Sequence, residues 1–454
     1  MLEYEAVIIG AGQSGVPLAM KLSKDGIKTA LVEKRLVGGT CINDGCTPTK
    51  TLIASAEQVY RIENSEKLGI HVPSYSVDFQ EVMQRKNDIV KQSREGSEKA
   101  IEEAENLTLF KGKAHFMAPK EIRVNQGMES AVLKGKYIFI DGGLRPAIPP
   151  LEGLDKVPFL TSTTLLDLKE CPEHLIIIGG SYIGLEMAQL FSRLGSRITI
   201  IEKSERVLAK EDADVAEAIQ DILRKEDIRF FLGAKVNSVH GQHPTVNIVV
   251  DGKEEQIKGT HLLMATGRKP QTEDLDLEKA GIKTDEHGFI EVDDQLETSI
   301  KGIYAMGDIK GGAAFTHISY NDYVIIYDNL MNGANRKYVY RQEPYCLFTD
   351  PQLGRIGLTE SMAKKQGLEI DVFKLPMEKS SRGKETVQIQ GFMKAVTEKE
   401  SGKILGASIL SAQGGEIMSI LQMAMAAGYT ALQLQEHVFA HPLFAESINN
   451  LFTT

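Results

Sequence analysis

Two segments of the chain, residues 5–33 and 174–202, follow the same order of apolar and polar positions. Each contains a short apolar run, a cluster of glycines, an amphipathic stretch, a single glycine, a second apolar run and a terminal glutamate. Short apolar runs that alternate with helical periodicity predict strand–helix–strand units with parallel strands. Because the pattern occurs twice, we expect an α/β chain that contains two similar domains.

The first glycine cluster has the spacing of a phosphate-binding loop. Gly10, Gly12 and Gly15 form a GxGxxG motif between a predicted strand and a predicted helix. In such a loop the first glycine allows a tight turn, the second lets a diphosphate approach the backbone, and the third lets helix and strand pack closely. Glu33, at the end of the next predicted strand, is placed to bind a ribose hydroxyl. The alternative is a glycine-rich turn without a ligand, which the strand, the helix and the distal glutamate together disfavour.

The second cluster departs from this motif at one position. Ser181 stands between Gly179 and Gly184, where the middle glycine belongs. Its hydroxyl would lie near a bound phosphate, and the sequence leaves open whether it weakens binding or adds a hydrogen bond. Glu202 favours the free 2′-hydroxyl of NAD(H), because a carboxylate repels the 2′-phosphate of NADP(H). The neighbouring Lys203 keeps NADPH as the alternative.

Composition and charge narrow the class of protein. The 454 residues are 42% hydrophobic and 25% charged, which is typical of a globular chain of several domains. A net charge of −10 argues against a general nucleic-acid-binding protein. There is no apolar run of membrane-spanning length and no signal-peptide pattern, so we expect a cytoplasmic protein without membrane attachment. Four cysteines do not make a disulfide scaffold, and a disulfide in a reducing compartment would be catalytic.

Two of these cysteines, Cys41 and Cys46, stand in the segment GGTCINDGCTPTK at residues 38–50. Gly45 eases a turn that could bring the two sulfurs to disulfide distance. The amphipathic stretch that follows predicts that a helix begins near Cys46, and a helix N-terminus stabilises a thiolate. A structural metal site is the alternative, but the other two cysteines are isolated and no second pair of ligands accompanies the motif.

This segment, together with both glycine motifs, resembles the class I pyridine nucleotide-disulfide oxidoreductases, which include dihydrolipoamide dehydrogenase, glutathione reductase, mercuric reductase and the reactive-chlorine-resistance flavoproteins. The resemblance covers nearly the whole chain through MATGRKP at 264–270, GIYAMGD at 302–308, FTDPQLGRIGLTE at 348–360 and HPLFAES at 441–447. It implies two Rossmann-like domains, for FAD and NAD, and a C-terminal α+β dimerisation domain. The implied boundaries are 1–146 and 266–336 for the FAD domain, 147–265 for the NAD domain and 337–454 for the dimerisation domain.

The resemblance also assigns cofactor contacts to residues in the matching motifs. The implied FAD contacts are the adenosine-binding Gly10, Gly12, Gly15 and Glu33, the diphosphate and flavin approach at Gly39 and Thr40, the adenine contact Ala114, the ribitol or diphosphate contact Asp308, and the flavin contacts Thr316 and Lys50. The implied contacts to NADH, with NADPH as the alternative, are Gly179, Gly184, Glu202, Val236 and Gly267. Beside the flavin, Lys50 is implied to form an ion pair with Glu186, and such a cation stabilises a reduced flavin.

The resemblance further assigns the reacting groups. Cys46 would be the thiol that faces the flavin, and Cys41 would be the interchange thiol that attacks the substrate. His441 would act as acid–base, oriented by Glu446, because a hydrogen-bonded carboxylate fixes the imidazole tautomer and supports its charged form. In the family this histidine reaches the disulfide of the other subunit, so a homodimer is implied.

The implied reaction passes electrons from NAD(P)H through FAD and a Cys41–Cys46 disulfide to a small oxidised acceptor, such as a disulfide, a metal ion (Hg(II) or Cu(II)) or a quinone-like oxidant. A flavoprotein sensor or interaction protein with weak turnover is the alternative, and a plain NADH oxidase is a third reading. No resident metal is expected. Asp44 lies between the cysteines where many relatives carry an apolar residue. We expect its charge to raise the thiol pKa and to discourage anionic substrates.

Overall fold

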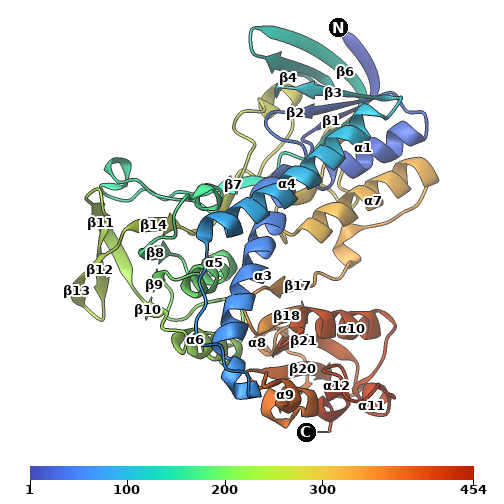
Figure 1. Cartoon of the computed structure of the whole chain (residues 1–454). Helices are drawn as coiled ribbons and strands as arrows, with labels where there is room; N and C mark the ends of the chain where they lie inside the picture. Colours follow the sequence, from blue (N-terminus) through green and yellow to red (C-terminus); the bar gives the residue numbers. More distant parts are fainter. Residues whose placement is uncertain (454) are drawn as a thin grey trace. The chain divides into compact units, whose positions relative to one another are not determined.

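The computed structural model describes residues 1–453, which form two compact units. Unit 1 contains residues 1–51, 83–147 and 267–341. Unit 2 contains residues 52–82, 148–266 and the chain from residue 342 onward. The first two boundaries between the units, after residues 51 and 82, fall inside α3 (Cys46–Glu63) and α4 (Phe79–Glu102). Figure 1 shows these two long helices.

Unit 1 is built on a seven-stranded sheet in which β16 pairs with β6 beside the order β3-β2-β1-β6-β5-β4. Its strands are β1 (Leu2–Ile9), β2 (Thr29–Glu33), β3 (Leu107–Lys111), β4 (Lys113–Ala118), β5 (Glu121–Gln126), β6 (Glu129–Ile140) and β16 (Ile303–Ala305). The pairs that involve β1, β2, β3 and β16 are parallel, whereas β4, β5 and β6 form an antiparallel excursion. The short strands β7 (Leu144–Pro146) and β15 (Arg268–Pro270) pair in an antiparallel two-stranded sheet.

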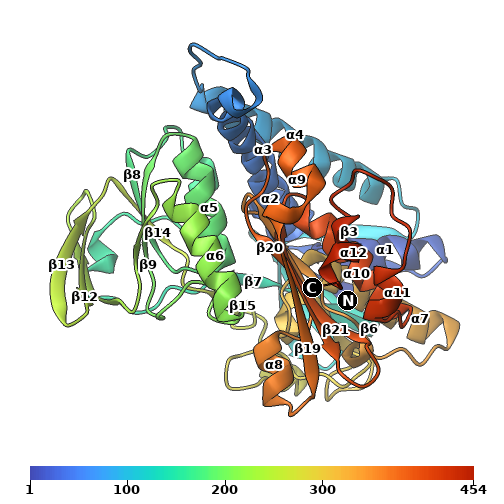
Figure 2. The same cartoon turned by 90° about the horizontal axis from the view of Figure 1, so that it is seen from below.

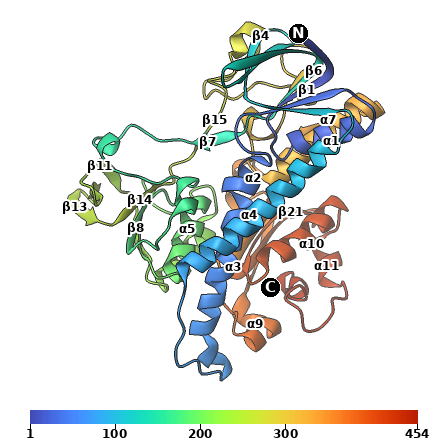
Figure 3. The ribbon, with the colours of Figure 1, turned by 45° about the horizontal axis from the view of Figure 1, so that its top comes forward.

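The alternation of side chains along β1 divides the apolar core of unit 1 into two layers. Ile8 packs with residues of α1 (Gly15–Lys24) and α7 (Thr316–Asn332), two helices that lie side by side in Figure 3. Val7 and Ile9 point to the other face, which packs against β4, β5 and the segment around residues 275–290. The sheet is therefore covered on both faces, and the chain leaves its carboxyl edge through the glycine loop after β1.

Unit 2 contains a second parallel sheet with the order β10-β9-β8-β14. Its strands are β8 (His174–Ile178), β9 (Arg197–Ile201), β10 (Arg229–Phe231) and β14 (His261–Met264). The helices α5 (Tyr182–Arg193) and α6 (Ala213–Arg224) accompany this sheet in Figure 2. An antiparallel sheet of β11 (Lys235–His240), β12 (Thr245–Val250) and β13 (Lys253–Lys258) follows.

The C-terminal part of unit 2 is an antiparallel five-stranded sheet with the order β17-β18-β21-β20-β19. Its strands are β17 (Tyr345–Leu347), β18 (Gln352–Gly357), β19 (Ile370–Pro376), β20 (Phe392–Glu398) and β21 (Ile404–Ser411). The accompanying helices are α8 (Glu360–Lys365), α9 (Ser381–Thr386), α10 (Gly414–Ala426), α11 (Ala431–Gln435) and α12 (Ser447–Leu451). Of these, α10 packs on β18 and β21.

The predicted fold class is confirmed, with two parallel α/β sheets of the expected kind and a C-terminal α+β part. The helix predicted to begin near Cys46 begins at that residue. Within residues 1–453, no helix combines the length and the apolar character needed to span a lipid bilayer.

Candidate active site

The glycine loop of unit 1 joins β1 to α1 in a turn that leaves no room for side chains. The Gly10 N–H donates to the Val32 carbonyl at 2.7 Å, which ties the loop to the end of β2. A Cβ at Gly15 would lie 2.0 Å from the Gly10 carbonyl oxygen, so only glycine fits there. The first turn of α1 contains no acidic residue of its own, which favours an anion at this helix end.

Glu33, the last residue of β2, points its carboxylate into this loop. Its Oε2 accepts from the Ala11 N–H at 2.9 Å, and its Oε1 accepts from the Arg35 N–H at 2.7 Å. The carboxylate is thereby fixed beside the glycines, where the sequence predicts a ribose contact.

The other residues predicted to contact the adenosine half and the diphosphate also lie in unit 1. Gly39 adopts a φ of +61°, and a Cβ there would lie 2.9 Å from the Gly12 Cα. It begins α2 (Gly39–Asp44), with Thr40 next in the helix. Ala114 is buried in β4.

The second glycine loop repeats the backbone turn of the first and its hydrogen bonds to the strand-end glutamate. The Gly179 N–H donates to the end of β9 at 2.9 Å, and a Cβ at Gly184 would lie 2.0 Å from the Gly179 carbonyl oxygen. Glu202 accepts from the Gly180 N–H at 2.6 Å and from the Ser204 N–H at 2.8 Å. The repeat that the sequence predicts is therefore a repeat of backbone geometry, and a conserved carboxylate position in both copies supports a ribose contact in each.

Ser181 is the one departure within the second loop. It precedes α5 with extended backbone angles (φ −92°, ψ −178°), and its hydroxyl does not cap the helix. Its side chain is exposed. The missing middle glycine therefore causes no backbone strain.

Cys41 and Cys46 lie on two successive helices, α2 and α3, with Gly45 between them. Cys41 is half-buried and Cys46 is exposed. The Cys46 Sγ lies 3.4 Å from the Thr316 Oγ1 at the start of α7. A hydrogen bond to Cys46 and burial raise the pKa of the Cys41 thiol above its ordinary value, and a hydrogen bond from Thr316 opposes this rise.

The expectation that the charge of Asp44 raises the pKa of the neighbouring thiols needs correction for Cys41. Arg35 forms a two-pronged ion pair with the Asp44 carboxylate. The guanidinium offsets the negative charge next to the cysteines, and Asp44 is not among the main causes that raise the pKa of Cys41. The sequence could not show this pair, because it depends on how the turn after β2 folds back on α2.

Asp308 and Thr316 lie on opposite sides of a glycine-rich connection in unit 1. Asp308 belongs to a short 3-10 turn, and burial raises the pKa of its carboxyl, with Arg268 opposing the rise at 3.8 Å. Gly307, just before it, donates its N–H to the Asp322 carboxylate at 2.8 Å. These contacts hold the Asp308 carboxyl in the same unit as the first glycine loop, as its predicted role requires.

Sequence reasoning missed Asp141, which directly follows β6. It is buried, and its carboxylate accepts from the Ser14 hydroxyl at 2.7 Å and from the Gly15 N–H at 2.8 Å. Burial raises the pKa of Asp141 to about 7. The signal was available, because an acidic residue after a buried apolar strand is unusual. The role of Asp141 could not be predicted, because nothing in the sequence indicates that Asp141 contacts Ser14 in the folded chain.

His441 and Glu446 lie in unit 2 and are within hydrogen-bond distance of each other. The His441 Nδ1 is 2.9 Å and 3.0 Å from the two carboxylate oxygens of Glu446. Two-thirds of the His441 side chain, 66%, is exposed, so its other nitrogen can meet a partner outside the chain. Their roles in proton transfer remain predictions.

The remaining predicted residues are divided between the units. Lys50 lies in the first turns of α3 in unit 1, and Gly267 is exposed in unit 1 with a φ of +124°. Val236 lies in β11 of unit 2. Glu186 is buried in α5 of unit 2, where it accepts from the Phe348 N–H at 2.9 Å. The predicted ion pair of Lys50 with Glu186 would involve residues of both units and stays a prediction.

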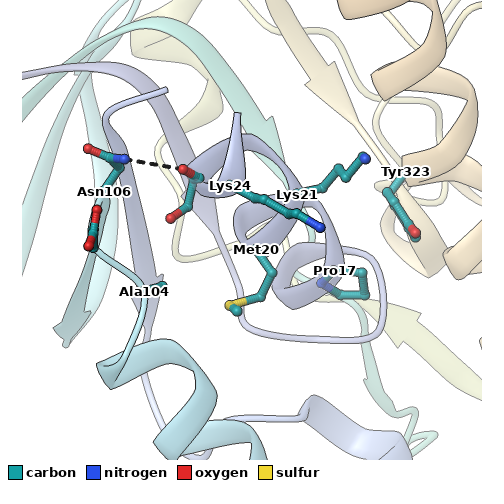
Figure 4. A pocket seen from close by; sticks show the side chains of 9 residues that line it. Pro17, Met20, Lys21, Lys24, Ala104, Asn106 and Tyr323 are labelled. Carbon is teal, nitrogen blue, oxygen red and sulfur yellow. Dashed lines mark hydrogen bonds between the residues drawn. The ribbon is translucent and has the colours of Figure 1, made fainter. Parts of the chain in front are cut away.

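A separate hollow of about 520 Å³ lies at the other end of α1 and contains none of the predicted site residues (Figure 4). Its lining comes from α1, from the turn before β3 and from α7, and comprises Pro17, Met20, Lys21, Ser23, Lys24, Ala104, Glu105, Asn106 and Tyr323. One hydrogen bond crosses it, from the Asn106 Nδ2 to the Ser23 carbonyl at 3.3 Å. The two lysines and Glu105 give it a mixed charge.

Comparison with known proteins identifies the family. A model of the pyridine nucleotide-disulphide oxidoreductases matches residues 4–322, and the dimerisation-domain model of the same group matches residues 343–452. The chain belongs to this family. It is therefore an enzyme of the flavoprotein oxidoreductase class that uses FAD and NAD(P)H.

Several relatives are similar along nearly the whole length of this chain. The probable pyridine nucleotide-disulfide oxidoreductase RclA of Escherichia coli strain K12 is 37% identical, over 100% of this chain and 99% of that protein. A mercuric reductase of Lysinibacillus sphaericus is 34% identical over 98% of this chain and 81% of that protein. A solved structure titled as a Cu(II) complex of the HOCl-induced flavoprotein disulfide reductase RclA from Escherichia coli superposes with a TM-score of 0.92 at 37% identity, covering 100% of this chain and 99% of that one.

The residues of this chain fit the two dinucleotides that the family uses. In each glycine loop a Cβ at the last glycine would strike the loop's own backbone, and the first turn of the helix that follows contains no acidic residue. Each loop also holds a carboxylate from the end of the neighbouring strand. The first loop differs from the second in one respect, because its Gly15 N–H already donates to the buried carboxyl group of Asp141.

Proposed function

We propose that this protein transfers two electrons from NADH, through FAD and a Cys41–Cys46 disulfide, to a thiol-reactive oxidised acceptor, with Cu(II) as the first candidate. The observation that carries the proposal is the position of the cysteine pair. Cys46 begins α3 and its sulfur lies 3.4 Å from the Thr316 hydroxyl, in the same unit as the first glycine loop. A pair of thiols on a flavin-binding unit is suited to pass electrons onward two at a time.

The two glycine loops would hold the two cofactors. FAD, when bound, accepts the hydride of NADH and makes its two electrons available to the disulfide. The loop after β1, with Glu33, would hold FAD, and the loop after β8 would hold NADH. Glu202 supports NADH over NADPH, because its carboxylate lies at the ribose end of the second loop and would repel a 2′-phosphate.

The two cysteines would have different roles, because their surroundings differ. Reduction breaks the sulfur–sulfur bond, adds two electrons and leaves one sulfur on each residue. The pKa of the Cys41 thiol is raised, so Cys41 needs a base before it can attack an acceptor. Thr316 assists, because its hydroxyl can donate a hydrogen bond to sulfur. The His441 imidazole, held by Glu446, would take up that proton.

A homodimer supplies that histidine in the proposal. The dimerisation-domain match supports it, and the exposed ring of His441 in one chain would serve the cysteines of the other chain. The proposed location is the cytoplasm, where NADH is available and unpaired thiols persist.

Cu(II) is favoured among acceptors because reduced cysteines are soft ligands that stabilise Cu(I). A solved structure of the Escherichia coli relative is of its Cu(II) complex, and several other relatives are mercuric reductases. Two Cu(II) ions would take one electron each while the Cys41–Cys46 disulfide reforms and two protons leave. A small disulfide would take both electrons and two protons and leave as two thiols.

The test compares NADH-dependent formation of Cu(I), followed with a Cu(I)-specific chelator, in the wild type and in two cysteine variants. Cys41→Ser should lower the rate by about 100-fold or more, since it removes the interchange thiol. The matched control Cys171→Ser should retain it, because Cys171 lies in unit 2, where its sulfur contacts the Leu194 carbonyl and the Ser196 hydroxyl. Unchanged Cu(I) formation in Cys41→Ser would contradict the proposal. Flavin reduction without turnover on any acceptor would favour the sensor alternative.

A further inference from the structure

The carboxyl group of Asp141 lies at the centre of the first glycine loop. Ser14 precedes α1, and its hydroxyl donates to the Asp141 Oδ1 at 2.7 Å instead of capping the helix. The Gly15 N–H, one of the free donors of the helix end, donates to the Oδ2 at 2.8 Å. The side chain therefore occupies part of the helix terminus that the family uses to bind a diphosphate.

Two further glycines close around the same carboxyl group. A Cβ at Gly12 would lie 2.6 Å from the Asp141 Oδ2, and a Cβ at Gly307 would lie 2.9 Å from the Oδ1. The Asp141 carboxyl is thus in direct contact with the loop backbone.

The second glycine loop is an internal comparison that lacks this acid. Ala265 occupies the matching position, and both residues donate their backbone N–H to the end of the first strand of their sheet, at 2.7 Å for Asp141 and 2.8 Å for Ala265. Ile183 stands where the first loop has Ser14. Because the second loop forms the same turn without either polar side chain, the Ser14–Asp141 pair is not required to make the turn.

The charges that face Asp141 are mostly negative. Burial is the main cause that raises its pKa to about 7; hydrogen bonds from Ser14 and Gly15 oppose the rise, and the carboxylates of Asp308 and Glu33 add to it. At neutral pH this carboxyl is therefore close to half protonated.

The nearby cations are paired with other acids. Lys310 and Arg341 both form ion pairs with Asp322, and Arg268 lies 3.8 Å from Asp308. A diphosphate in the loop would add further negative charge at the same helix end and would exclude water. Both effects disfavour ionised Asp141.

We propose that Asp141 couples FAD binding to the uptake of one proton, so that the first loop binds its diphosphate with Asp141 as a neutral acid. In that form the carboxyl keeps the hydrogen bond from Gly15 through one oxygen and donates from the other to Ser14. Asp141 is a positioning residue, which acts through the loop backbone. This inference rests on the proposed assignment of FAD to the loop after β1.

The test is a titration of the flavin-stripped, oxidised full-length protein with FAD between pH 6 and pH 9, followed by quenching of flavin fluorescence. Oxidised protein is used because its paired cysteines do not titrate. The wild-type Kd should be constant below pH 7 and rise about tenfold per pH unit above it, the slope of one linked proton. Calorimetry at pH 8 in buffers of different ionisation enthalpy should show uptake of about one proton.

Two variants separate the titration of Asp141 from its contacts. Asp141→Asn retains a donor and an acceptor of the same shape, so its Kd should be nearly independent of pH and its proton uptake should be lost. Ser14→Ala, the matched control, removes the hydroxyl and leaves the acid, so the pH dependence should persist. A wild-type Kd that does not change with pH, or an Asp141→Asn variant that keeps the dependence, would overturn the inference alone. Failure to bind FAD at any pH would overturn the proposed function as well.

Discussion

Cys41 and Cys46 differ in their surroundings, although only four residues of the chain separate them. Cys46 is exposed and stands at the N-terminus of α3, where helix N–H groups favour a negative charge. Cys41 is half-buried, and its thiol pKa is raised by its hydrogen bond to Cys46 and by burial. The raised pKa means that Cys41 carries its proton at neutral pH and reacts as a thiolate only once a base has removed it.

Thr316→Val should move the alkylation profile of Cys41 to higher pH. The Thr316 hydrogen bond lowers the pKa of Cys41, and a hydrogen bond to a charged group contributes roughly 1.5 kcal/mol, which corresponds to about one pH unit. The measurement is the rate of carboxamidomethylation of Cys41 in reduced protein against pH, followed by mass spectrometry. Thr51→Val, whose hydroxyl bonds to the Thr47 carbonyl within α3, is the control and should leave the profile in place. A profile that does not respond to Thr316→Val would show that this hydroxyl does not act on the thiol.

Single residues differ in how far the sequence predicts them. Glu33 and Glu202 are predictable, because each ends a strand at a fixed place in a repeated motif. Asp141 and Arg35 are not, because each acts through a contact that only the folded chain makes: Asp141 with Ser14, and Arg35 with Asp44.

At the scale of elements, the two strand–glycine loop–helix units are the part that the sequence predicts best. Alternating apolar runs place β1, α1 and β2 in one unit and β8, α5 and β9 in the other, and the structure has all six. The antiparallel pairing of β4, β5 and β6 has no comparable sequence pattern, because it depends on which strands meet in the folded sheet. The sequence also does not predict that residues 52–82 belong to unit 2, because α3 and α4 each continue without a break across a boundary between the units.

Gly184→Ala should weaken NADH binding by about tenfold or more and leave the FAD content of the protein unchanged. The added Cβ would lie 2.0 Å from the Gly179 carbonyl oxygen, so the second loop must shift, and overpacking of this kind costs roughly 1–3 kcal/mol. The measurement is the NADH dependence of flavin reduction by stopped flow. Gly96→Ala is the control: this glycine lies within α4 with open space around it, and alanine there should stabilise the helix without affecting NADH. Loss of FAD from Gly184→Ala would contradict the assignment of the second loop.

At the scale of the whole molecule, the account requires two chains. The cysteine pair belongs to unit 1, and the His441–Glu446 pair belongs to unit 2 in the part matched by the dimerisation domain. Only the resemblance to the family predicts that the histidine acts on the cysteines of the other chain. No pattern of hydrophobicity or spacing in the sequence predicts it. A surface imidazole beside a carboxylate has no distinctive sequence signal apart from such a motif.

A heterodimer of two inactive variants should therefore recover activity. Cys41→Ser and His441→Gln each inactivate a homodimer in this account, but a heterodimer carries one site with native cysteines and a native histidine. Coexpression with two affinity tags, followed by purification of the mixed species, should yield about half of the wild-type rate per dimer. Activity no higher than that of the two parents would mean that His441 serves the cysteines of its own chain or takes no part.

The central claim is that electrons from NADH open the bond between Cys41 and Cys46. The most direct measurement is a count of accessible thiols in oxidised holoprotein, under anaerobic conditions, before and after one equivalent of NADH. The account predicts two new thiols per flavin, assigned by mass spectrometry to Cys41 and Cys46, with Cys171 and Cys346 unchanged. Consumption of NADH with no new thiol would contradict it.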